Sequence, residues 1–271
     1  LMADGLAPPA RPSRLNRAAL RMRIVAACCD ALIFNSRRIA GQYAALYGWP
    51  WRKIRIIRNA AGTADAGGIV GRREDASDVV VGAVGQVSRT KGADLTLEAF
   101  ARITPRFAGA RLRYVGDGAL IDELRRRAAE LGVQDRVCFA GFVADRERAF
   151  GDLDLFVLPS RRESSSNAVA EAMARGLPCV VSDAGGLPEL VAHGKSGLVV
   201  RGDDVTALAE AMATLLGDAK LRRRMGAAAR QRAAEMFDPA MMARQTVEVV
   251  LGEMCVDRER ATGRFFEDAS S

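Results

Sequence analysis

Short apolar runs alternate with amphipathic segments along the middle of the chain, from residue 79 to residue 216. The runs predict six strands, which are Val79–Val84, Leu112–Val115, Val137–Ala140, Leu155–Leu158, Cys179–Val181 and Leu198–Val200. The segments between them predict four helices, which are Ala93–Ile103, Leu120–Leu131, Ala168–Arg175 and Val205–Leu216. Strands that alternate with helices form a parallel sheet covered by helices. The pattern therefore predicts an α/β fold with a doubly wound, Rossmann-like parallel sheet.

The two ends of the chain predict a partial second α/β domain and a pair of helices. Near the start, two helices and two short strands bury too little surface to stand alone; they are Arg17–Cys29, Ala31–Asn35, Arg38–Tyr47 and Ile54–Ile57. We interpret residues 1–60 as the end of a preceding domain, and Asn59–Gly71, rich in Gly and Ala, as a linker. Residues 61–237 then form the Rossmann-like domain. Residues 238–271 add a bridging helix, since Lys220–Met236 and Pro239–Met254 follow each other without a strand, and a polar tail over Asp257–Ser271.

The charge balance limits the classes of partner. A net charge of +7 fits a nucleic-acid binder, a protein that binds anionic membranes, or an enzyme with phosphorylated substrates. Aromatic residues make up only 6% of the chain, so no platform for single-stranded nucleic acid is expected. The segment Arg11–Arg23 is basic and helical in pattern, which favours either peripheral contact with an anionic membrane or, more often, an ordinary domain-surface helix.

Cysteine usage and the absence of targeting patterns favour a cytoplasmic protein. The cysteines are odd in number and show no paired metal-ligand spacing, so we expect reduced thiols, mostly in the core. No run approaches the roughly 18 apolar residues that span a bilayer, and Leu1–Pro12 lacks the pattern of a secretion signal.

The strongest candidate for chemistry is the segment Ser160–Asn167, which follows the predicted strand Leu155–Leu158. In an open α/β sheet, ligands bind beyond the carboxyl ends of the strands, where the next helix presents free backbone N–H groups to a phosphate. The small residues Ser164–Ser166 allow close approach of a ligand, although serines at this place also cap helices. Glu163 precedes the helix and Glu171 lies about one turn inside it, so we expect both carboxylates to face one crevice and to accept hydrogen bonds from sugar hydroxyls.

These residues resemble the signature of the retaining glycosyltransferases of family 4, also called glycosyl transferases group 1. The family's pattern is Ser-x-x-Glu-Gly-x-x-Asn-x-x-x-Glu-Ala-Met-Ala-x-Gly-x-Pro-Val-Val. From Ser160 to Val181 the chain reads Ser-Arg-Arg-Glu-Ser-Ser-Ser-Asn-Ala-Val-Ala-Glu-Ala-Met-Ala-Arg-Gly-Leu-Pro-Cys-Val-Val. The resemblance extends over about Ile54 to Phe237. Its further landmarks are Gly85–Gly92, Gly116–Gly118, Gly141–Val143, Asp183–Val191 and Gly194–Val199.

The resemblance implies the C-terminal, donor-binding half of a GT-B fold, and it implies roles for individual residues. Lys91 is expected to pair with the donor diphosphate, and Glu163 is expected to contact the transferred sugar, which makes these two the catalytic candidates. Glu171 is expected to bind the ribose, and the backbone of Ser165–Asn167 to bind sugar hydroxyls or phosphate. The full donor-binding set that the resemblance implies is Gly85, Gln86, Arg89, Lys91, Gly116, Gly118, Ser164, Ser165, Ser166, Asn167 and Glu171.

The implied reaction transfers a sugar from a nucleotide-sugar donor to a glycan or lipid-linked acceptor, in polysaccharide or glycolipid biosynthesis. The anomeric configuration is retained, and the donor's own diphosphate assists in place of a metal or other cofactor. The chain departs from the family at Gln86, where Arg is usual and for which Arg89 is a substitute, and at Ser164, where Gly is usual. The glycine-rich loop and the histidine of the family's N-terminal domain find no match.

Three other interpretations remain. Asp152-Leu153-Asp154 spells the Asp-x-Asp of metal-dependent glycosyltransferases of another fold, but it falls where a strand begins, so no metal site is predicted there. His193 lies in a polar turn and is expected to be a solvated loop residue. At the level of function, the alternatives are a truncated, non-catalytic nucleotide-sugar-binding module and another nucleotide-sugar enzyme such as an epimerase, because fold alone does not imply function.

Overall fold

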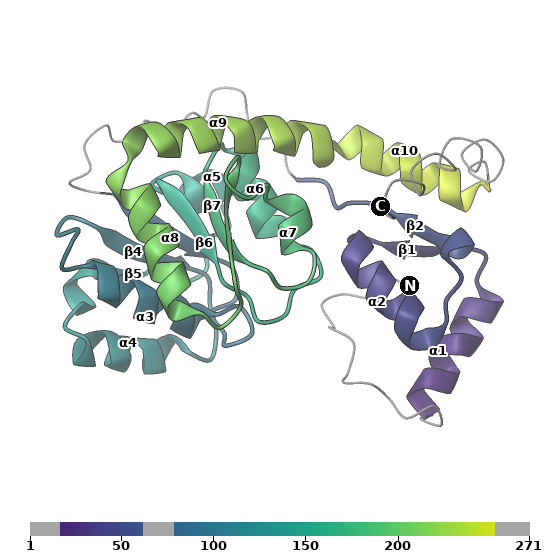
Figure 1. Ribbon diagram of the computed structural model, residues 1–271, viewed down its shortest axis with the longest axis horizontal. Helices are drawn as coiled ribbons and strands as arrows, with labels where there is room; N and C mark the ends of the chain where they lie inside the picture. The colour runs from purple at the N-terminus through teal and green to yellow at the C-terminus, as the bar shows by residue number, and fades with distance from the viewer. Residues whose placement is uncertain (1–16, 62–78, 253–271) are drawn as a thin grey trace, which may run out of the picture.

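The computed structural model of the chain describes residues 17–61 and 79–252. These residues form a larger unit around a six-stranded sheet and a smaller unit around a two-stranded sheet (Figure 1). The predicted linker beyond residue 61, the first part of the basic segment Arg11–Arg23, the polar tail Asp257–Ser271 and Cys255 lie outside the described residues.

The larger sheet is parallel throughout and has the strand order β5-β4-β3-β6-β7-β8. Its strands are β3 (Val80–Val84), β4 (Arg111–Val115), β5 (Val137–Phe139), β6 (Leu155–Leu158), β7 (Cys179–Ser182) and β8 (Gly197–Val200). The chain runs outward from β3 through β4 and β5, and then returns to build β6, β7 and β8 on the other side of β3. The strand order thus reverses between β3 and β6, which confirms the predicted doubly wound, Rossmann-like sheet.

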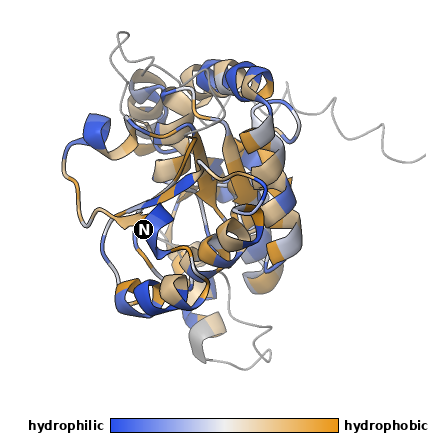
Figure 2. Cartoon of the chain, turned by 90° about the vertical axis from the view of Figure 1, so that its left-hand side faces the viewer, coloured by the Kyte–Doolittle hydropathy of each residue, from blue (hydrophilic) through white to orange (hydrophobic). Residues whose placement is uncertain are grey.

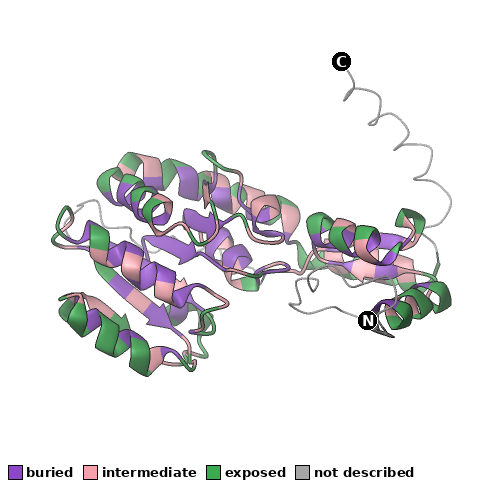
Figure 3. Ribbon diagram, turned by 60° about the horizontal axis from the view of Figure 1, so that its bottom comes forward, coloured by how far each residue is buried: buried purple, intermediate pink, exposed green. Residues whose placement is uncertain are grey.

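Helices cover both faces of this sheet because its strands are apolar on both sides. In β6, Leu155 and Val157 pack into one core, and Phe156 and Leu158 pack into the other. The first core is covered by α3 (Ala93–Ile103), α4 (Ile121–Glu130) and α8 (Val205–Gly217). The second is covered by α5 (Arg146–Phe150), α6 (Asn167–Ala174), α7 (Leu187–Leu190) and α9 (Ala219–Met236). Figure 2 shows hydrophobic strands enclosed by helices with hydrophilic outer sides, and Figure 3 shows the strands as mostly buried.

The smaller unit is held together by an aromatic cluster. It consists of α1 (Arg17–Cys28), β1 (Leu32–Phe34), α2 (Arg37–Tyr47), η1 (Trp51–Lys53) and β2 (Ile54–Ile56), with β1 parallel to β2. The rings of Phe34, Tyr43, Tyr47 and Trp49 lie with centroids 5.5 to 5.8 Å apart, a spacing typical of favourable aromatic pairs. These large side chains form a local core despite the shortness of the strands.

The last helix of the described residues, α10 (Pro239–Val250), extends from the larger unit to the smaller one (Figure 1). The backbone N–H of Ala60 donates to Met242 Sδ at 3.2 Å, and the N–H of Ala61 donates to the Phe237 carbonyl at 3.2 Å. Helix α10 therefore bridges the two units. The domain boundaries at residues 60 and 237 stay a prediction.

The cysteines of the described residues differ in exposure. The expectation of core thiols holds for Cys179, which is buried, but is wrong for Cys28 and Cys138, which are exposed. Cys138 lies on β5 at the edge of the sheet, where one side of the strand has no neighbour to cover it.

Within residues 17–61 and 79–252, no helix has both the length and the apolar character needed to cross a membrane.

Candidate functional site

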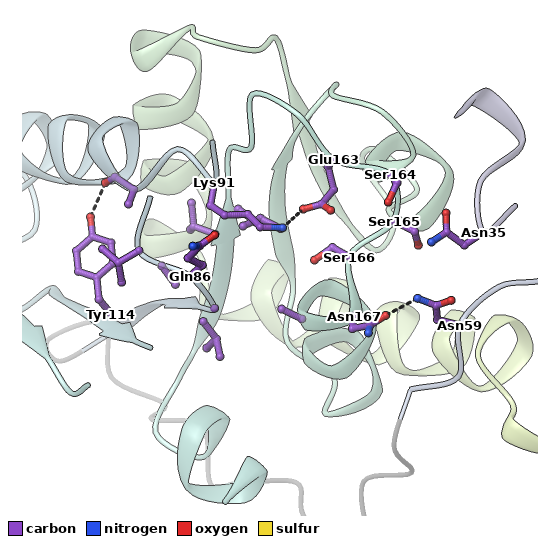
Figure 4. Close-up of a pocket in the computed structure, with 18 residues that line it drawn as sticks. Asn35, Asn59, Gln86, Lys91, Tyr114, Glu163, Ser164, Ser165, Ser166 and Asn167 are labelled. Carbon is purple, nitrogen blue, oxygen red and sulfur yellow. Dashed lines mark hydrogen bonds and ion pairs between the residues drawn. The ribbon is translucent and has the colours of Figure 1, made fainter. Parts of the chain in front are cut away.

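A cavity of about 410 Å³ opens at the carboxyl ends of β3 and β6, where the strand order reverses (Figure 4). Ligand sites of doubly wound sheets lie at this position. The volume is that of a small-molecule site. The lining comes from four parts of the fold: the end of β3 with its loop and the start of α3, the buried Tyr114, the end of β6 with the loop into α6, and two residues of the smaller unit. The polar residues that line it are Asn35, Asn59, Gln86, Lys91, Tyr114, Glu163, Ser164, Ser165, Ser166 and Asn167.

Lys91 and Glu163 meet in this cavity as an ion pair. Lys91 Nζ donates to Glu163 Oε2 at 2.6 Å, although the two residues come from different loops. The Glu163 side chain is only 5% exposed and that of Lys91 is 32% exposed, so the lysine lies nearer to solvent. Ser160 Oγ donates to the same carboxylate oxygen at 3.4 Å. The structure therefore brings together the two residues that the sequence marked as catalytic.

The N-terminus of α6 opens onto the same cavity. Ser166 is the N-cap, and its hydroxyl accepts from the Val169 N–H at 3.3 Å, so the capping interpretation holds for this serine. Asn167 and Ala168, the first two residues of the helix, line the cavity. The first backbone hydrogen bond inside the helix runs from the Ala170 N–H to the Ser166 carbonyl. The backbone N–H groups of Asn167 and Ala168 come before it and have no acceptor within the helix. A helix terminus of this kind attracts anions.

Glu171 does not line this cavity, contrary to the expectation that it shares a crevice with Glu163. Its side chain is 14% exposed and forms an ion pair with Arg146, with 3.3 Å between Arg146 Nη1 and Glu171 Oε2. Arg146 begins the short helix α5, which the sequence pattern did not reveal and which packs beside α6. The role of Glu171 as a ribose ligand stays a prediction.

Three more predicted donor-binding residues lie outside the cavity lining. Arg89 is exposed and pairs with Glu123 and Asp94. Gly116 and Gly118 are needed for close backbone packing, because a Cβ on either would overlap a backbone carbonyl oxygen of the loop that follows β3. These two glycines allow the loop after β4 to pack against the loop with Gly85 and Gln86, both of which line the cavity.

An arginine that the sequence did not single out fastens the Glu163 loop to α3. Arg161 donates from Nη1 and Nη2 to the two carboxylate oxygens of Asp94, both at 2.8 Å, and from Nε to Asp203 at 2.6 Å. Burial raises the pKa of Asp94, but the hydrogen bonds and charge of Arg161 outweigh it, so the pKa lies below its ordinary value of 3.8. The bidentate geometry is one that only arginine supplies.

We expect Asp94→Asn to lower the free energy of unfolding by about 1–2 kcal/mol at pH 7, because a hydrogen-bonded charge pair is lost. Folding lowers the Asp94 pKa, so the ionised Asp94 contributes to the free energy of unfolding above about pH 4. This contribution disappears as the pH falls through the lowered pKa. Urea unfolding at pH 7 and near pH 3 should show the difference between wild type and variant shrinking at acid pH. The exposed Asp122, which pairs with Arg125 on α4, offers the control Asp122→Asn, for which little change is expected at either pH.

The remaining candidates have structural surroundings. Asp154 is buried and accepts from the Val80 N–H at 2.8 Å, and Asp152 pairs with Arg113 at 2.9 Å, so this Asp-x-Asp joins neighbouring segments of the sheet. His193 is exposed, and its Nδ1 accepts from the Val199 N–H at 3.0 Å. In the part of the chain that the structure describes, no three His, Cys, Asp or Glu side chains are grouped so as to hold a metal ion.

The structure also places residues at the cavity that the sequence did not mark as ligands. Tyr114 is buried beneath it and donates from its hydroxyl to the Ala93 carbonyl at 2.8 Å, at the start of α3. Asn35 and Asn59 reach it from the smaller unit. A signal for the asparagines exists, because Asn35 ends one predicted short strand and Asn59 lies two residues beyond the other, and parallel strands end at the same edge of a sheet.

Comparison with known proteins agrees with this architecture. The family model described as "Glycosyl transferases group 1" matches residues 71–232. The lipopolysaccharide core biosynthesis glycosyltransferase LpsE of Rhizobium meliloti (strain 1021) is 33% identical over 198 residues, which cover 72% of this chain and 56% of that protein. A GDP-mannose-dependent alpha-(1-6)-phosphatidylinositol monomannoside mannosyltransferase of Mycobacterium tuberculosis is 40% identical over 150 residues, covering 52% of this chain and 39% of that protein.

A solved structure has the same fold. Anabaena Alr3699/HepE in complex with UDP-glucose superposes with a TM-score of 0.75 at 25% identity, over 87% of this chain and 68% of that chain. The chain spans about half the length of the curated relatives it matches. Because the family model covers more than half of the residues, the chain belongs to the glycosyl transferases group 1 family.

Proposed function

We propose that this protein is a retaining glycosyltransferase that moves a sugar from a nucleotide-sugar donor to a glycan or lipid-linked acceptor, in polysaccharide or glycolipid biosynthesis. The observation that carries the proposal is the Lys91–Glu163 ion pair at the N-terminus of α6. One cation, one carboxylate and a helix terminus in a single cavity suit a ligand that joins an anionic part to a hydroxyl-rich part.

In this proposal the donor diphosphate binds at the backbone N–H groups of Asn167 and Ala168, within reach of Lys91. The helix terminus and the ammonium group stabilise the charge that grows on the diphosphate as the sugar leaves. Glu163 then contacts the hydroxyls of the transferred sugar, and the smaller unit lies on the acceptor side. Because these groups neutralise the diphosphate themselves, we propose that the reaction requires no metal.

Names of similar proteins support a nucleotide-activated hexose. The mycobacterial relative is named as GDP-mannose-dependent, and the Anabaena structure is titled as a complex with UDP-glucose. Lipopolysaccharide core and phosphatidylinositol monomannoside appear in the names of the two curated relatives, so a glycan or a lipid-linked acceptor is a reasonable expectation. Contact with an anionic membrane stays a separate prediction.

Calorimetric titration of the chain with UDP, GDP and ADP tests the donor site. We expect one of the three to bind saturably at one site, with the same affinity in the presence of EDTA. Lys91→Ala should weaken this binding, and its matched control is Lys195→Ala, which removes an exposed lysine from the turn before β8 and should leave the affinity unchanged. Absence of saturable binding by all three diphosphates would contradict the proposal.

A second candidate function, a nucleotide-sugar-binding module without transferase activity of its own, would use the same cavity. Incubation with UDP-glucose or GDP-mannose and lipid-extract acceptors separates the two. Acceptor-dependent release of the diphosphate supports the transferase, whereas saturable binding without release supports the module. Conversion of the donor sugar without any acceptor would instead support an epimerase.

A further inference from the structure

The smaller unit supplies two carboxamides to the cavity. Asn35 directly follows β1, and Asn59 lies three residues beyond the end of β2. Since β1 and β2 are parallel, both asparagines leave the same edge of the two-stranded sheet, the edge that faces the larger unit. Figure 4 shows them on the side of the loop with Ser164 and Ser165 that lies away from Lys91.

This wall of the cavity differs in charge from the wall that holds Lys91. Its lining consists of Asn35, Asn59, Ser164, Ser165 and Asn167, all neutral groups that both donate and accept hydrogen bonds. Groups of this kind match sugar hydroxyls, which also donate and accept, better than they match a phosphate, which accepts only. The side chains of this wall therefore suit sugar hydroxyls, and they lie beside the groups that attract an anion, which are Lys91 and the backbone N–H groups at the N-terminus of α6.

The two asparagines are held differently. Asn59 Nδ2 donates to Asn167 Oδ1 at 2.9 Å, so its position is tied to the first residue of α6. Within the described residues, the Asn35 side chain has no hydrogen bond, and it is only partly exposed. Its carboxamide is thus available to a ligand in the cavity.

Glu189 of α7 fixes the backbone next to Asn35. Its carboxylate accepts from Ser36 Oγ at 2.8 Å, from the Arg37 N–H at 3.1 Å and from the Arg38 N–H at 2.6 Å. A carboxylate at a helix N-terminus is favourable, so Glu189 acts as a cap for α2 from the other unit. Ser36 is the N-cap of α2 and the neighbour of Asn35 in the chain, so this contact sets where Asn35 meets the cavity.

We infer that Asn35 and Asn59 bind hydroxyl groups of the sugar part of the donor, and that Glu189 is the positioning residue that holds Asn35 at the cavity. The inference rests on the proposed function and adds to it the residues that recognise the sugar. It also gives the smaller unit a part in donor binding, in addition to its place on the acceptor side.

The test measures two affinities in parallel for each variant, one for the nucleoside diphosphate that the chain binds and one for the matching nucleotide-sugar, UDP-glucose or GDP-mannose. We expect Asn35→Ala and Asn59→Ala each to raise the Kd of the nucleotide-sugar about 3- to 10-fold, as loss of one hydrogen bond predicts. The Kd of the diphosphate should stay within about twofold, since only the sugar contacts are lost. Asn35→Ser and Asn59→Ser, which keep a small neutral polar group but withdraw the carboxamide, should show the same selective loss if an alanine variant unfolds.

A double-mutant cycle tests the positioning role. Glu189→Ala should raise the nucleotide-sugar Kd as Asn35→Ala does, and the double variant should add little to either single change. A merely structural role of Glu189 would give additive effects and would weaken the diphosphate as well. The control is Gln134→Ala, which removes an exposed carboxamide from η3 (Gln134–Arg136) beside the edge strand β5.

The outcomes separate this inference from the proposed function. If no diphosphate and no nucleotide-sugar binds the wild-type chain, both fail. If the diphosphate binds and depends on Lys91, but the asparagine variants keep wild-type affinity for the nucleotide-sugar, only this inference is overturned. Equal weakening of both ligands by the asparagine variants would overturn it too, because the asparagines would then act on the diphosphate side.

Discussion

Replacing Lys91 with alanine should weaken the binding of a nucleoside diphosphate about 10- to 100-fold, the equivalent of the roughly 1.5–3 kcal/mol of a charge-assisted hydrogen bond. Lys91 is the cation that lines the cavity beside the N-terminus of α6, and its ammonium group reaches the Glu163 carboxylate at 2.6 Å. In the proposed function, an arriving diphosphate replaces this carboxylate as the partner of Lys91. The remaining affinity of the variant comes from the backbone N–H groups of the helix. Calorimetric titration of wild type and variant measures the change.

The same substitution should also lower the free energy of unfolding, because it leaves the Glu163 carboxylate almost buried without its cation. A buried pair loses roughly 3–5 kcal/mol when one partner is removed, and the exposure of Lys91 reduces the expected loss to about 1–2 kcal/mol. Binding and stability can be separated with the double variant Lys91→Ala, Glu163→Gln. It should recover most of the stability, since no uncompensated charge remains, but not the affinity for the diphosphate. Recovery of affinity would contradict the role given to Lys91.

Arginine at position 91 gives a finer distinction. Lys91→Arg keeps the positive charge but replaces a compact ammonium group with a larger, planar guanidinium group. We expect an affinity between those of wild type and Lys91→Ala, with stability close to wild type. An affinity as low as that of the alanine variant would mean that the size of the group matters more than its charge.

The strands and the longer helices of this fold could be predicted from the sequence, and helices of about one turn could not. The six strands of the larger sheet are apolar runs in a clear alternation with helices, so the predicted limits differ from the observed ones by at most one residue. Helices α5 and α7 span only five and four residues, too few to show a helical period, and neither was predicted. Because α5 was not predicted, the ion pair between its Arg146 and Glu171 was not predicted either.

Within the candidate site, the sequence predicted local geometry better than contacts between distant segments. The order of residues from β6 into α6 places Glu163 and the serines at the end of a central strand, whatever the rest of the chain does. The bond from Asn59 to Asn167, and the contact of Glu189 with the start of α2, join residues more than a hundred positions apart. Such contacts depend on how the two units pack, and no periodicity within a single segment encodes that packing.

The loop that carries Glu163 rests on the loop that follows β7, and glycine is required where they touch. Gly185 has a φ of +50°, and a Cβ there would overlap the carbonyl oxygen of Glu163 and lie 2.6 Å from its carbonyl carbon. Neither backbone segment is the flexible end of a side chain, so one of the loops has to move. The position of the Glu163 carboxylate, and hence of its partner Lys91, therefore depends on a residue that lines no part of the cavity.

Gly185→Ala should lower the free energy of unfolding by roughly 3–5 kcal/mol, the sum of left-handed backbone strain and the displaced loop. In a chain of this size, this corresponds to a fall in Tm of roughly 10 °C in a calorimetric scan. Nucleoside diphosphate affinity should fall as well, because the displaced loop leads into the N-terminus of α6.

The matched control is Gly194→Ala, at a glycine with a φ of +75° and open space around the position of a Cβ. In this variant only the left-handed backbone strain should lower the free energy of unfolding, by about 1–2 kcal/mol. It should bind the diphosphate as the wild type does. The difference between the two variants isolates the contact between the loops from the cost of the left-handed conformation. Equal losses of Tm in both variants, or wild-type affinity in Gly185→Ala, would show that the loop after β7 does not hold Glu163 in place.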